Sequence, residues 1–319
     1  MSAPIPAHAA VLVVSHRSSD LLARHLAATV DGLDADVVVV DNSPDDDERS
    51  ATVALGASRG WHVVESPNDG FGAGVNLAAR HALARGARSL LMVNPDLSLS
   101  SSTAAALLAD VRARPDTLVA PVVLRADGST WFSGGTLDLG LGRTRATGTA
   151  GDDDVAWLSG ACLAVSDDAW QLLAGFDERY FLYWEDVDLS WRARAAGLRL
   201  AVRRDLTTMH EVGGTQEHAG SRRRSDMYYE QNCRNRLMFA AHHLDGAGRR
   251  RWSRHSIGWG RAVVLRGGRR QLLRGPGPLL AVTRGTLSGL RYARRRRPAW
   301  PLDATGATGA ARAATGEVG

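Results

Sequence analysis

Three carboxylates lie within four positions of the chain, and aromatic residues come directly before them. Glu185, Asp186 and Asp188 follow the segment 180–184, which reads Tyr-Phe-Leu-Tyr-Trp. Carboxylates repel one another and favour water, so grouping them beside apolar rings is costly unless a proton, a cation or a substrate hydroxyl is shared there. The pattern indicates such a site, and it is also typical of acids that complement the dipole at the start of a helix.

The residues after these acids predict a helix that begins at the acids. Apolar and small residues recur at the i, i+3, i+4, i+7 spacing from position 189 to position 196, and Gly197 is placed to end the helix. The carboxylates are therefore expected at a helix N-terminus, where the remaining elements of the chain must bring a substrate to them.

The first part of the chain predicts strands that alternate with helices. Apolar runs at 10–15, 36–41, 61–65 and 89–93 are typical of strands buried on both faces of a sheet, and helical patterns lie between them. This order predicts an α/β domain, in which ligands bind at the carboxyl ends of the strands.

Two loops at predicted strand ends have the composition of a nucleotide site. Asp41, Asn42 and Ser43 follow the second strand, where an acid and an amide can bind a nucleobase or ribose or can form an Asx-turn. The loop 68–76 follows the third strand and has glycines at 70, 72 and 74 before a helix, which is a plausible diphosphate cradle. Its spacing and place differ from the dinucleotide-binding fingerprint.

A third loop and a later histidine have the composition of a metal site. Asp96 follows the fourth strand in Asn94-Pro95-Asp96, where an isolated acid suits a divalent cation that also binds a diphosphate. The alternative is a cap for a helix at 101–113. His210 precedes a glycine-rich loop and could bind metal or phosphate, although a lone histidine is more often structural.

Composition divides the chain unevenly. It has 319 residues, a net charge of +5 and 39 basic residues, every one of them Arg, and about half of these follow position 221. Such a region attracts anions: a membrane surface, a pyrophosphate or nucleic acid. The two cysteines indicate no disulfide framework or zinc site, and we expect both to be buried thiols in a reducing compartment. No signal peptide and no membrane-spanning segment is expected.

These patterns predict three regions. We expect a catalytic domain at 1–222. It contains a β-rich stretch at 117–166 that ends in a strand at 157–165, then a short helix that Asp167 and Asp168 can cap, and later a strand at 198–202. We expect a helical region at 223–300, in which Arg clusters alternate with Trp and Leu. That region suits helices lying in an anionic membrane interface, with a polybasic run at 294–297, or a solvated appendage packed on the catalytic domain. Residues 301–319 are expected to be a disordered tail.

Several motifs occur in an order that resembles the family 2 inverting glycosyltransferases of GT-A fold. Within them, the chain is similar to the bacterial rhamnosyltransferase group that extends lipid-linked glycans. The resemblance covers about 9–245. The motifs are VVVVDNS (37–43), NDGFGAGVN (68–76), MVNPD (92–96), WLSGACLAV (157–165), GFDERYFLYWEDVDLSWR (175–192) and the His210 loop.

The resemblance implies roles for the candidate residues. Asp186 corresponds to the catalytic base, with Glu185 beside it near the acceptor. Asp96 is the direct ligand of Mg²⁺ or Mn²⁺, with His210 near the metal and the diphosphate, and Asn94 replaces the first acid of the family's metal motif. The implied donor-binding residues are Asp41, Asn42, Ser43, Asn68, Gly70, Phe71, Gly72, Asn76 and Asn94. The implied acceptor-side residues are Trp184, Gly160 and Asp188, of which Asp188 holds the helix start or positions Arg192.

The resemblance also implies a reaction. We expect a single L-rhamnose to move from dTDP-L-rhamnose onto a polyprenyl-diphosphate-linked saccharide in cell-wall or polysaccharide biosynthesis, at the cytoplasmic face of the membrane. Polymerising relatives carry Q-x-x-R-W, whereas this chain has Asn235 in place of the Trp, which favours single-sugar addition. The alternatives are another donor, such as UDP-galactofuranose or UDP-GlcNAc, or a soluble acceptor. The oligomeric state is not predicted.

Two other classes fit the sequence less well. A nucleotidyltransferase shares the α/β plan, but its usual Gly-rich first loop with Arg and Lys is missing after Val14. A nucleic-acid-binding protein would explain the basic charge, but that charge is crowded into the last third of the chain and no nucleic-acid motif is recognised. We therefore expect no nucleic-acid partner.

Overall fold

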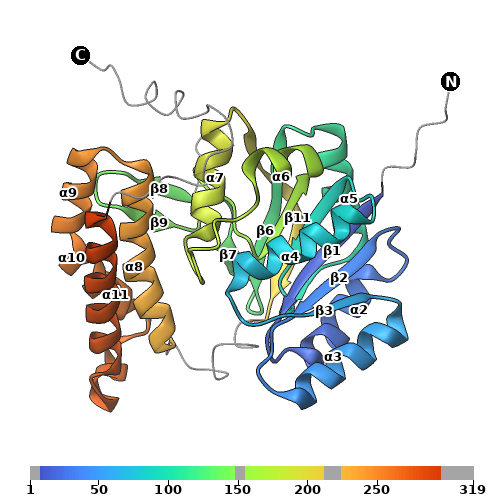
Figure 1. The fold of residues 1–319 in the computed structure, drawn as a ribbon, viewed down its shortest axis with the longest axis horizontal. Coiled ribbons are helices and arrows are strands. Elements are labelled where there is room, and N and C mark those ends of the chain that lie inside the picture. The colour runs from blue at the N-terminus through green and yellow to red at the C-terminus, as the bar shows by residue number, and fades with distance from the viewer. Residues whose placement is uncertain (1–7, 148–154, 212–223, 296–319) are drawn as a thin grey trace.

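The computed structural model describes residues 8–147, 155–211 and 224–295 (Figure 1). The glycine-rich loop after His210, the last two residues of the polybasic run and the tail predicted at 301–319 lie outside the described residues.

The first half of the chain forms the parallel part of a mixed sheet. The order β3-β2-β1-β4 places each strand beside its neighbour in the parallel direction. The run Val37–Val40 is buried because helices cover both faces of the sheet, as an uninterrupted apolar strand requires. Parallel strands end at one edge, so the loops that follow them lie together. The bounds are β1 Ala9–Ser15, β2 Asp36–Asp41, β3 His62–Glu65 and β4 Ser89–Val93.

The second half extends the same sheet with both strand directions. β10 is antiparallel to β4 and β6, β11 is parallel to β6, and β5 closes the order antiparallel to β11. Within the described residues the sheet has nine strands, with β7 pairing β6, and β8 and β9 form a separate hairpin. The bounds are β5 Leu97–Ser98, β6 Thr117–Arg125, β7 Thr130–Phe132, β8 Thr136–Asp138, β9 Arg143–Arg145, β10 Cys162–Ser166 and β11 Arg199–His210.

Three local predictions are corrected by the structure. The strand expected to end at Val202 continues to His210, because its pairing with β6 resumes after an irregularity between Arg203 and Thr207. The strand expected from Trp157 begins only at Cys162, and Trp157 makes an isolated bridge. The short helix α6 is capped by Ser166 and not by the acids after it, because the Ser166 hydroxyl accepts the Ala169 N–H.

Helices cover both faces of the sheet (Figure 1). α4 packs on β1 and β2, and α5 packs on β4, β6 and β10. α5 is capped by Ser100, so Asp96 does not serve as its cap. The bounds are α1 Ser19–Leu21, the π-helix η1 Leu22–Leu26, α2 Ala27–Val30, α3 Asp46–Arg59, α4 Phe71–Ala84, α5 Ser101–Ala113, α6 Asp167–Leu173 and α7 Glu185–Ala195.

The C-terminal helices pack beside α7, on the side away from the parallel strands (Figure 1). α8 and α11 lie in close contact, because Gly285 and Gly289 let α11 approach the α8 backbone. Trp184 and Val187 share a hydrophobic cluster with Trp252 and Trp259. No helix among the described residues is both long and apolar enough to cross a membrane. The bounds are α8 Asp226–His243, α9 Gly246–Arg254, α10 Ser256–Arg266, the 3-10 helix η3 Arg269–Arg274 and α11 Gly277–Arg294.

Candidate active site

A pocket of about 560 Å³ lies between the sheet edge and the C-terminal helices. Its lining joins the two sequence regions predicted to act on a substrate, the acids of α7 and the loop after β4. It also includes side chains from the C-terminal helices, which are close neighbours of those acids. The principal polar and aromatic lining residues are Asn94, Asp96, Arg125, Trp131, Trp157, Tyr183, Trp184, Glu185, Asp186, His210, Arg224, Tyr228, Asn232 and Arg266.

The start of α7 has an unusual backbone that presents the acids to the pocket. Tyr183 and Trp184 have positive φ angles of 67° and 76°, which bulky L-residues rarely adopt. The side-chain amide of the buried Asn235, from α8, donates to the carbonyls of Leu182 and Tyr183 at 2.9 and 2.8 Å. The C-terminal region therefore holds the turn from which the acidic helix begins.

Asp186 has the environment of a group that can accept a proton near neutral pH. Its Oδ1 accepts the Val187 N–H at 2.8 Å, and its Oδ2 lies 3.4 Å from the Gly160 N–H. Burial raises the pKa of Asp186 to about 6, against the opposing effect of these backbone donors. Since the side chain is still partly exposed to the pocket, it can reach a bound hydroxyl.

Glu185 is buried more deeply than its neighbour. Burial, followed by the charge of Asp186, raises its pKa well above the usual range. Its Oε2 is buried and has no hydrogen-bond partner within the described part of the chain. The pair can therefore hold one proton on Glu185 while Asp186 is ionised.

Asp96 and His210 meet because β5 and β11 pair. His210 lies opposite Leu97 in that pairing, and the Glu211 N–H donates to the Asp96 carbonyl at 2.9 Å. His210 Nε2 is 3.3 Å from Asp96 Oδ2, and the imidazole stacks on Trp131. Asp96 Oδ1 and His210 Nδ1 are buried without a hydrogen-bond partner among the described residues. Oxygen and imidazole donors held in this way fit a divalent cation.

The loop after β2 lies at the same sheet edge. Two of its hydrogen-bond acceptors have no partner among the described residues. Asp41 Oδ1 accepts the Ser43 N–H at 2.8 Å, so the Asx-turn is present, yet Asp41 Oδ2 and Asn42 Oδ1 are buried and unbonded. Asn42 Nδ2 donates to the side-chain Oδ1 of Asn68 at 3.3 Å, which links this loop to the glycine-rich one. These acceptors could bind the N–H groups of a nucleobase.

The glycines at the start of α4 allow close packing. Gly70 has φ 103° and lies against the Phe181 carbonyl, which accepts the Phe71 N–H at 2.9 Å, and Gly72 packs on Phe176. Asn76 uses its amide on the backbone of Phe176 and on Glu178. Of these residues, only Phe71 lines the pocket. The main role of the loop is therefore to support the turn that leads into the acids of α7.

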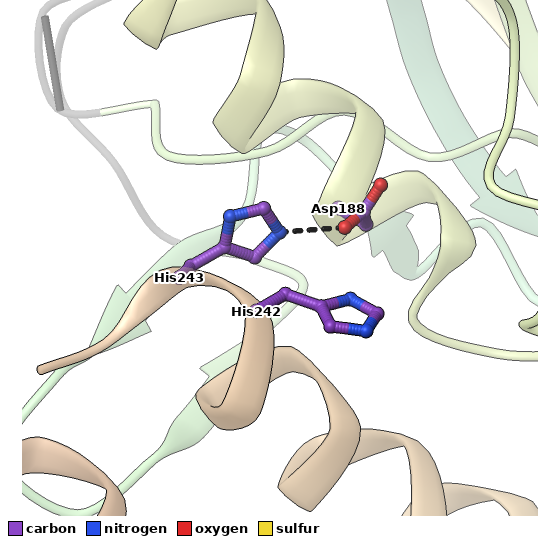
Figure 2. Close-up of side chains that lie close together, drawn as sticks. All are labelled: Asp188, His242 and His243. Atoms are coloured by element: carbon purple, nitrogen blue, oxygen red, sulfur yellow. Dashed lines mark hydrogen bonds and ion pairs between the residues drawn. The ribbon is translucent and has the colours of Figure 1, made fainter. Parts of the chain in front are cut away.

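Of the residues predicted on the acceptor side, Trp184 and Gly160 line the pocket, whereas Asp188 is fully buried outside its lining. Asp188 Oδ2 accepts from Arg192 Nε at 2.7 Å, and Oδ1 lies 2.6 Å from His243 Nε2 (Figure 2). Burial raises a carboxyl pKa, but the charges of Arg192 and His243 hold that of Asp188 well below its usual range.

Asp188, His242 and His243 offer ligand atoms that all lie within 4.8 Å of one another, close enough to hold a metal ion. Both Asp188 oxygens already accept hydrogen bonds, and His242 Nε2 lies 2.8 Å from the Tyr292 hydroxyl. Burial lowers the pKa of His242 to about 3, so this imidazole is neutral. We interpret the cluster as a buried polar network that joins α7 to α8.

Removal of the Asp188 carboxylate is expected to destabilise the fold. Asp188→Ala should lower the free energy of unfolding by about 3–5 kcal/mol, because it leaves the Arg192 guanidinium buried without its partner. Urea denaturation followed by circular dichroism measures the change. Asp46→Ala is the matched control, since that carboxylate is 95% exposed. Equal unfolding midpoints for the two variants would contradict the assignment.

The sequence did not indicate several residues that complete the site. Asn235, Tyr228 and Arg266 come from the C-terminal helices, and Trp131 comes from β7. The polar pair Arg234-Asn235 within a helical pattern was the one available signal, because a buried amide in a helix needs a partner from elsewhere.

The chain matches glycosyltransferase like family 2 over residues 6–240 and belongs to that family. The match begins before β1 and extends into α8, so it includes the acids at the start of α7 and the Asp96–His210 pair.

Two groups of relatives are similar over different lengths. Low-salt glycan biosynthesis hexosyltransferase Agl10 of Haloferax volcanii is 23% identical over 208 residues, 63% of this chain and 66% of that protein. N-acetylglucosaminyl-diphospho-decaprenol L-rhamnosyltransferase of Mycobacterium tuberculosis is 58% identical over 43 residues, 14% of each chain. The chain thus spans less than two thirds of the length of these relatives.

Two solved structures are similar in fold. GalNAc-T7 with UDP, GalNAc and Mn²⁺ has a TM-score of 0.58 and 12% identity, over 73% of this chain and 47% of that one. The likeness supports the GT-A fold predicted from the sequence. TarS 1–349 of S. aureus in complex with UDP has a TM-score of 0.48 and 16% identity, over 90% of this chain and 91% of that one.

Proposed function

We propose that this chain is an inverting glycosyltransferase that transfers one L-rhamnose from dTDP-L-rhamnose to a polyprenyl-diphosphate-linked saccharide. The short 58% identical match to a rhamnosyltransferase, whose name gives a decaprenyl-diphosphate acceptor, supports this donor and acceptor class. The alternative is another nucleotide sugar, such as UDP-galactofuranose or UDP-GlcNAc, or a soluble acceptor.

The observation that carries the proposal is the position of Asp186 in the pocket. An inverting transfer needs a base that removes the proton from the acceptor hydroxyl while that oxygen attacks the anomeric carbon from the face opposite the leaving group. Asp186 is partly exposed to the pocket and has a pKa raised to about 6 by burial, so at neutral pH it is ionised and more basic than an ordinary carboxylate. The Gly160 N–H and the start of α7 fix its orientation.

Asp96 and His210 would hold the divalent cation, Mg²⁺ or Mn²⁺. Both side chains line the pocket that also contains Asp186, and Asp96 Oδ1 and His210 Nδ1 have no hydrogen-bond partner among the described residues. When bound, the cation supplies Lewis-acid stabilisation of the negative charge that develops on the departing nucleoside diphosphate. Asp41 and Asn42, at the end of β2 on the same sheet edge, would bind the base of the donor.

The C-terminal region, from about residue 223, is proposed to contact the acceptor and the membrane. Tyr228 and Arg266 line the pocket beside the acids, and a guanidinium there suits an anionic group of the acceptor. The enzyme would then act at the inner face of the cell membrane as a peripheral protein.

Nucleotide release across a panel of nucleotide sugars tests this function. We expect release of dTDP from dTDP-rhamnose with Mg²⁺ or Mn²⁺ only when a short polyprenyl-diphosphate-GlcNAc acceptor is present. Acceptor-dependent release from a different donor would refute the rhamnose assignment and keep the base and metal roles. Release that is independent of every acceptor would contradict the proposed transfer.

A further inference from the structure

One end of the C-terminal helical bundle carries five exposed leucines. They are Leu265, Leu272, Leu273, Leu279 and Leu280, here termed the leucine tip, and their exposed fractions range from 37% to 87%. A single exposed leucine is ordinary in a soluble protein, but a group of this size in one short stretch of chain marks a surface that another apolar phase covers.

The shape of the tip is fixed by buried polar contacts. The Tyr229 hydroxyl of α8 donates to Gln271 Oε1 at 2.6 Å, and Gln271 Nε2 donates to the Val264 carbonyl at 2.7 Å. With Gln271 buried by these bonds, the next two residues, Leu272 and Leu273, are directed outward. The leucines are therefore presented by an anchored turn.

The charge around the tip selects the kind of partner. From Gly246 to Arg295 the sequence contains thirteen arginines and no acidic residue. Arg266 and Arg269 directly flank the leucines in the chain. Apolar side chains flanked in the chain by arginines match the acyl chains and the anionic headgroups of a bilayer together.

The tip is continuous with the active-site pocket. Arg266 follows Leu265 in the chain and lines the pocket that contains Asp186. Its Nη1 donates to the Tyr228 hydroxyl at 3.2 Å, and Tyr228 lines the same pocket. The first turn of α8 and the end of α10 thus connect the leucines to the acids, and a ligand that remains in the bilayer could reach Asp186 by this route.

We propose that the leucine tip docks on an anionic lipid bilayer and holds the mouth of the active-site pocket at the lipid surface. The leucine tip alone supports the membrane contact. The use of that contact to collect a lipid-linked acceptor rests on the proposed function. The contact requires no helix that crosses the bilayer.

Binding of the full chain to acceptor-free vesicles tests the docking. Vesicles of phosphatidylcholine with phosphatidylglycerol should bind the protein at least about tenfold more strongly than phosphatidylcholine alone. The double variant Leu272→Asp/Leu273→Asp should lose at least about tenfold of this affinity. The matched control is Val53→Asp/Leu172→Asp, which changes two exposed apolar residues of the catalytic domain and should bind like the unaltered chain.

Equal binding by both double variants would overturn the proposal. It would also be overturned if the unaltered chain bound no anionic vesicles. A dimer in gel filtration that the Leu272→Asp/Leu273→Asp change converts to a monomer would then assign the tip to contact between two copies of the chain. Turnover with a short, water-soluble acceptor should be unchanged in that variant and reports the chemistry separately. Tip-dependent binding without any turnover would support docking and refute the proposed function alone.

Discussion

Asp186→Asn is expected to lower kcat by about 10²–10⁴-fold and to leave the affinity for the donor unchanged. The amide has nearly the shape of the carboxylate, and its one oxygen can still accept one of the two backbone N–H groups, of Val187 or Gly160, but the amide cannot accept the proton of the acceptor hydroxyl. Steady-state kinetics with the active donor, together with calorimetric titration of the donor, separates the two effects. Turnover like that of the unaltered enzyme would exclude Asp186 as the base.

Glu185→Gln is the matched control, because it makes the same change one residue earlier. Burial and the charge of Asp186 raise the pKa of Glu185 well above its usual range, which favours the protonated carboxyl. Glutamine resembles that neutral form, and most of the turnover should remain. A loss as large as that of Asp186→Asn would instead assign the two acids to one catalytic unit.

The pH dependence follows from the same carboxyl. The pKa of Asp186 is raised to about 6, so kcat/KM should fall about tenfold per unit as pH drops below that value and should be level above it. The contribution of this carboxyl to the free energy of unfolding changes with pH in the opposite direction. A carboxyl with a raised pKa stabilises the fold at low pH, and this contribution is lost as pH rises through 6. Asp186→Asn should therefore not lower the melting temperature at neutral pH.

The sequence was sufficient to predict the places where short-range pattern decides structure. The four predicted apolar runs form the parallel strands β1 to β4. The residues at helical spacing from position 189 lie in α7, which has the acids in its first turn. Asp41 and Asp96 fall at one sheet edge because parallel strands share their direction, which is a geometric consequence of the strand–helix order.

Other parts of the site depend on contacts between distant segments. The pairing of β5 with β11 brings His210 to Asp96 across more than a hundred residues. The family resemblance implied that the two lie together, whereas no local signal distinguishes His210 from a loop histidine. Bulky L-residues disfavour the positive φ angles that Tyr183 and Trp184 adopt. Hydrogen bonds from Asn235, on another helix, hold this backbone in place. Tertiary structure can impose such a backbone, and local sequence does not encode it.

Asp96→Ala is expected to lower kcat by about 10²–10³-fold at saturating donor and to weaken Mn²⁺ binding. Asp96 supplies the one carboxylate of the Asn94-Pro95-Asp96 turn, and its Oδ1 has no competing hydrogen-bond partner in the described residues. Paramagnetic titration of Mn²⁺ with the nucleoside diphosphate measures the affinity without turnover. EDTA should abolish activity of the unaltered enzyme, and added Mg²⁺ or Mn²⁺ should restore it.

Asn94→Asp should strengthen cation binding, whereas Asp96→Ala weakens it. A gain and a loss together test the metal assignment more stringently than a loss alone. Asn94 lines the pocket two residues before Asp96, and a second carboxylate there adds negative charge at the proposed cation site. Mn²⁺ should bind more tightly to this variant. Asp168→Ala, which removes an exposed carboxylate from α6, should change neither affinity nor rate. Unchanged Mn²⁺ affinity in both Asp96→Ala and Asn94→Asp would place the cation elsewhere, and the polar network around Asp188 would then be the next group to test.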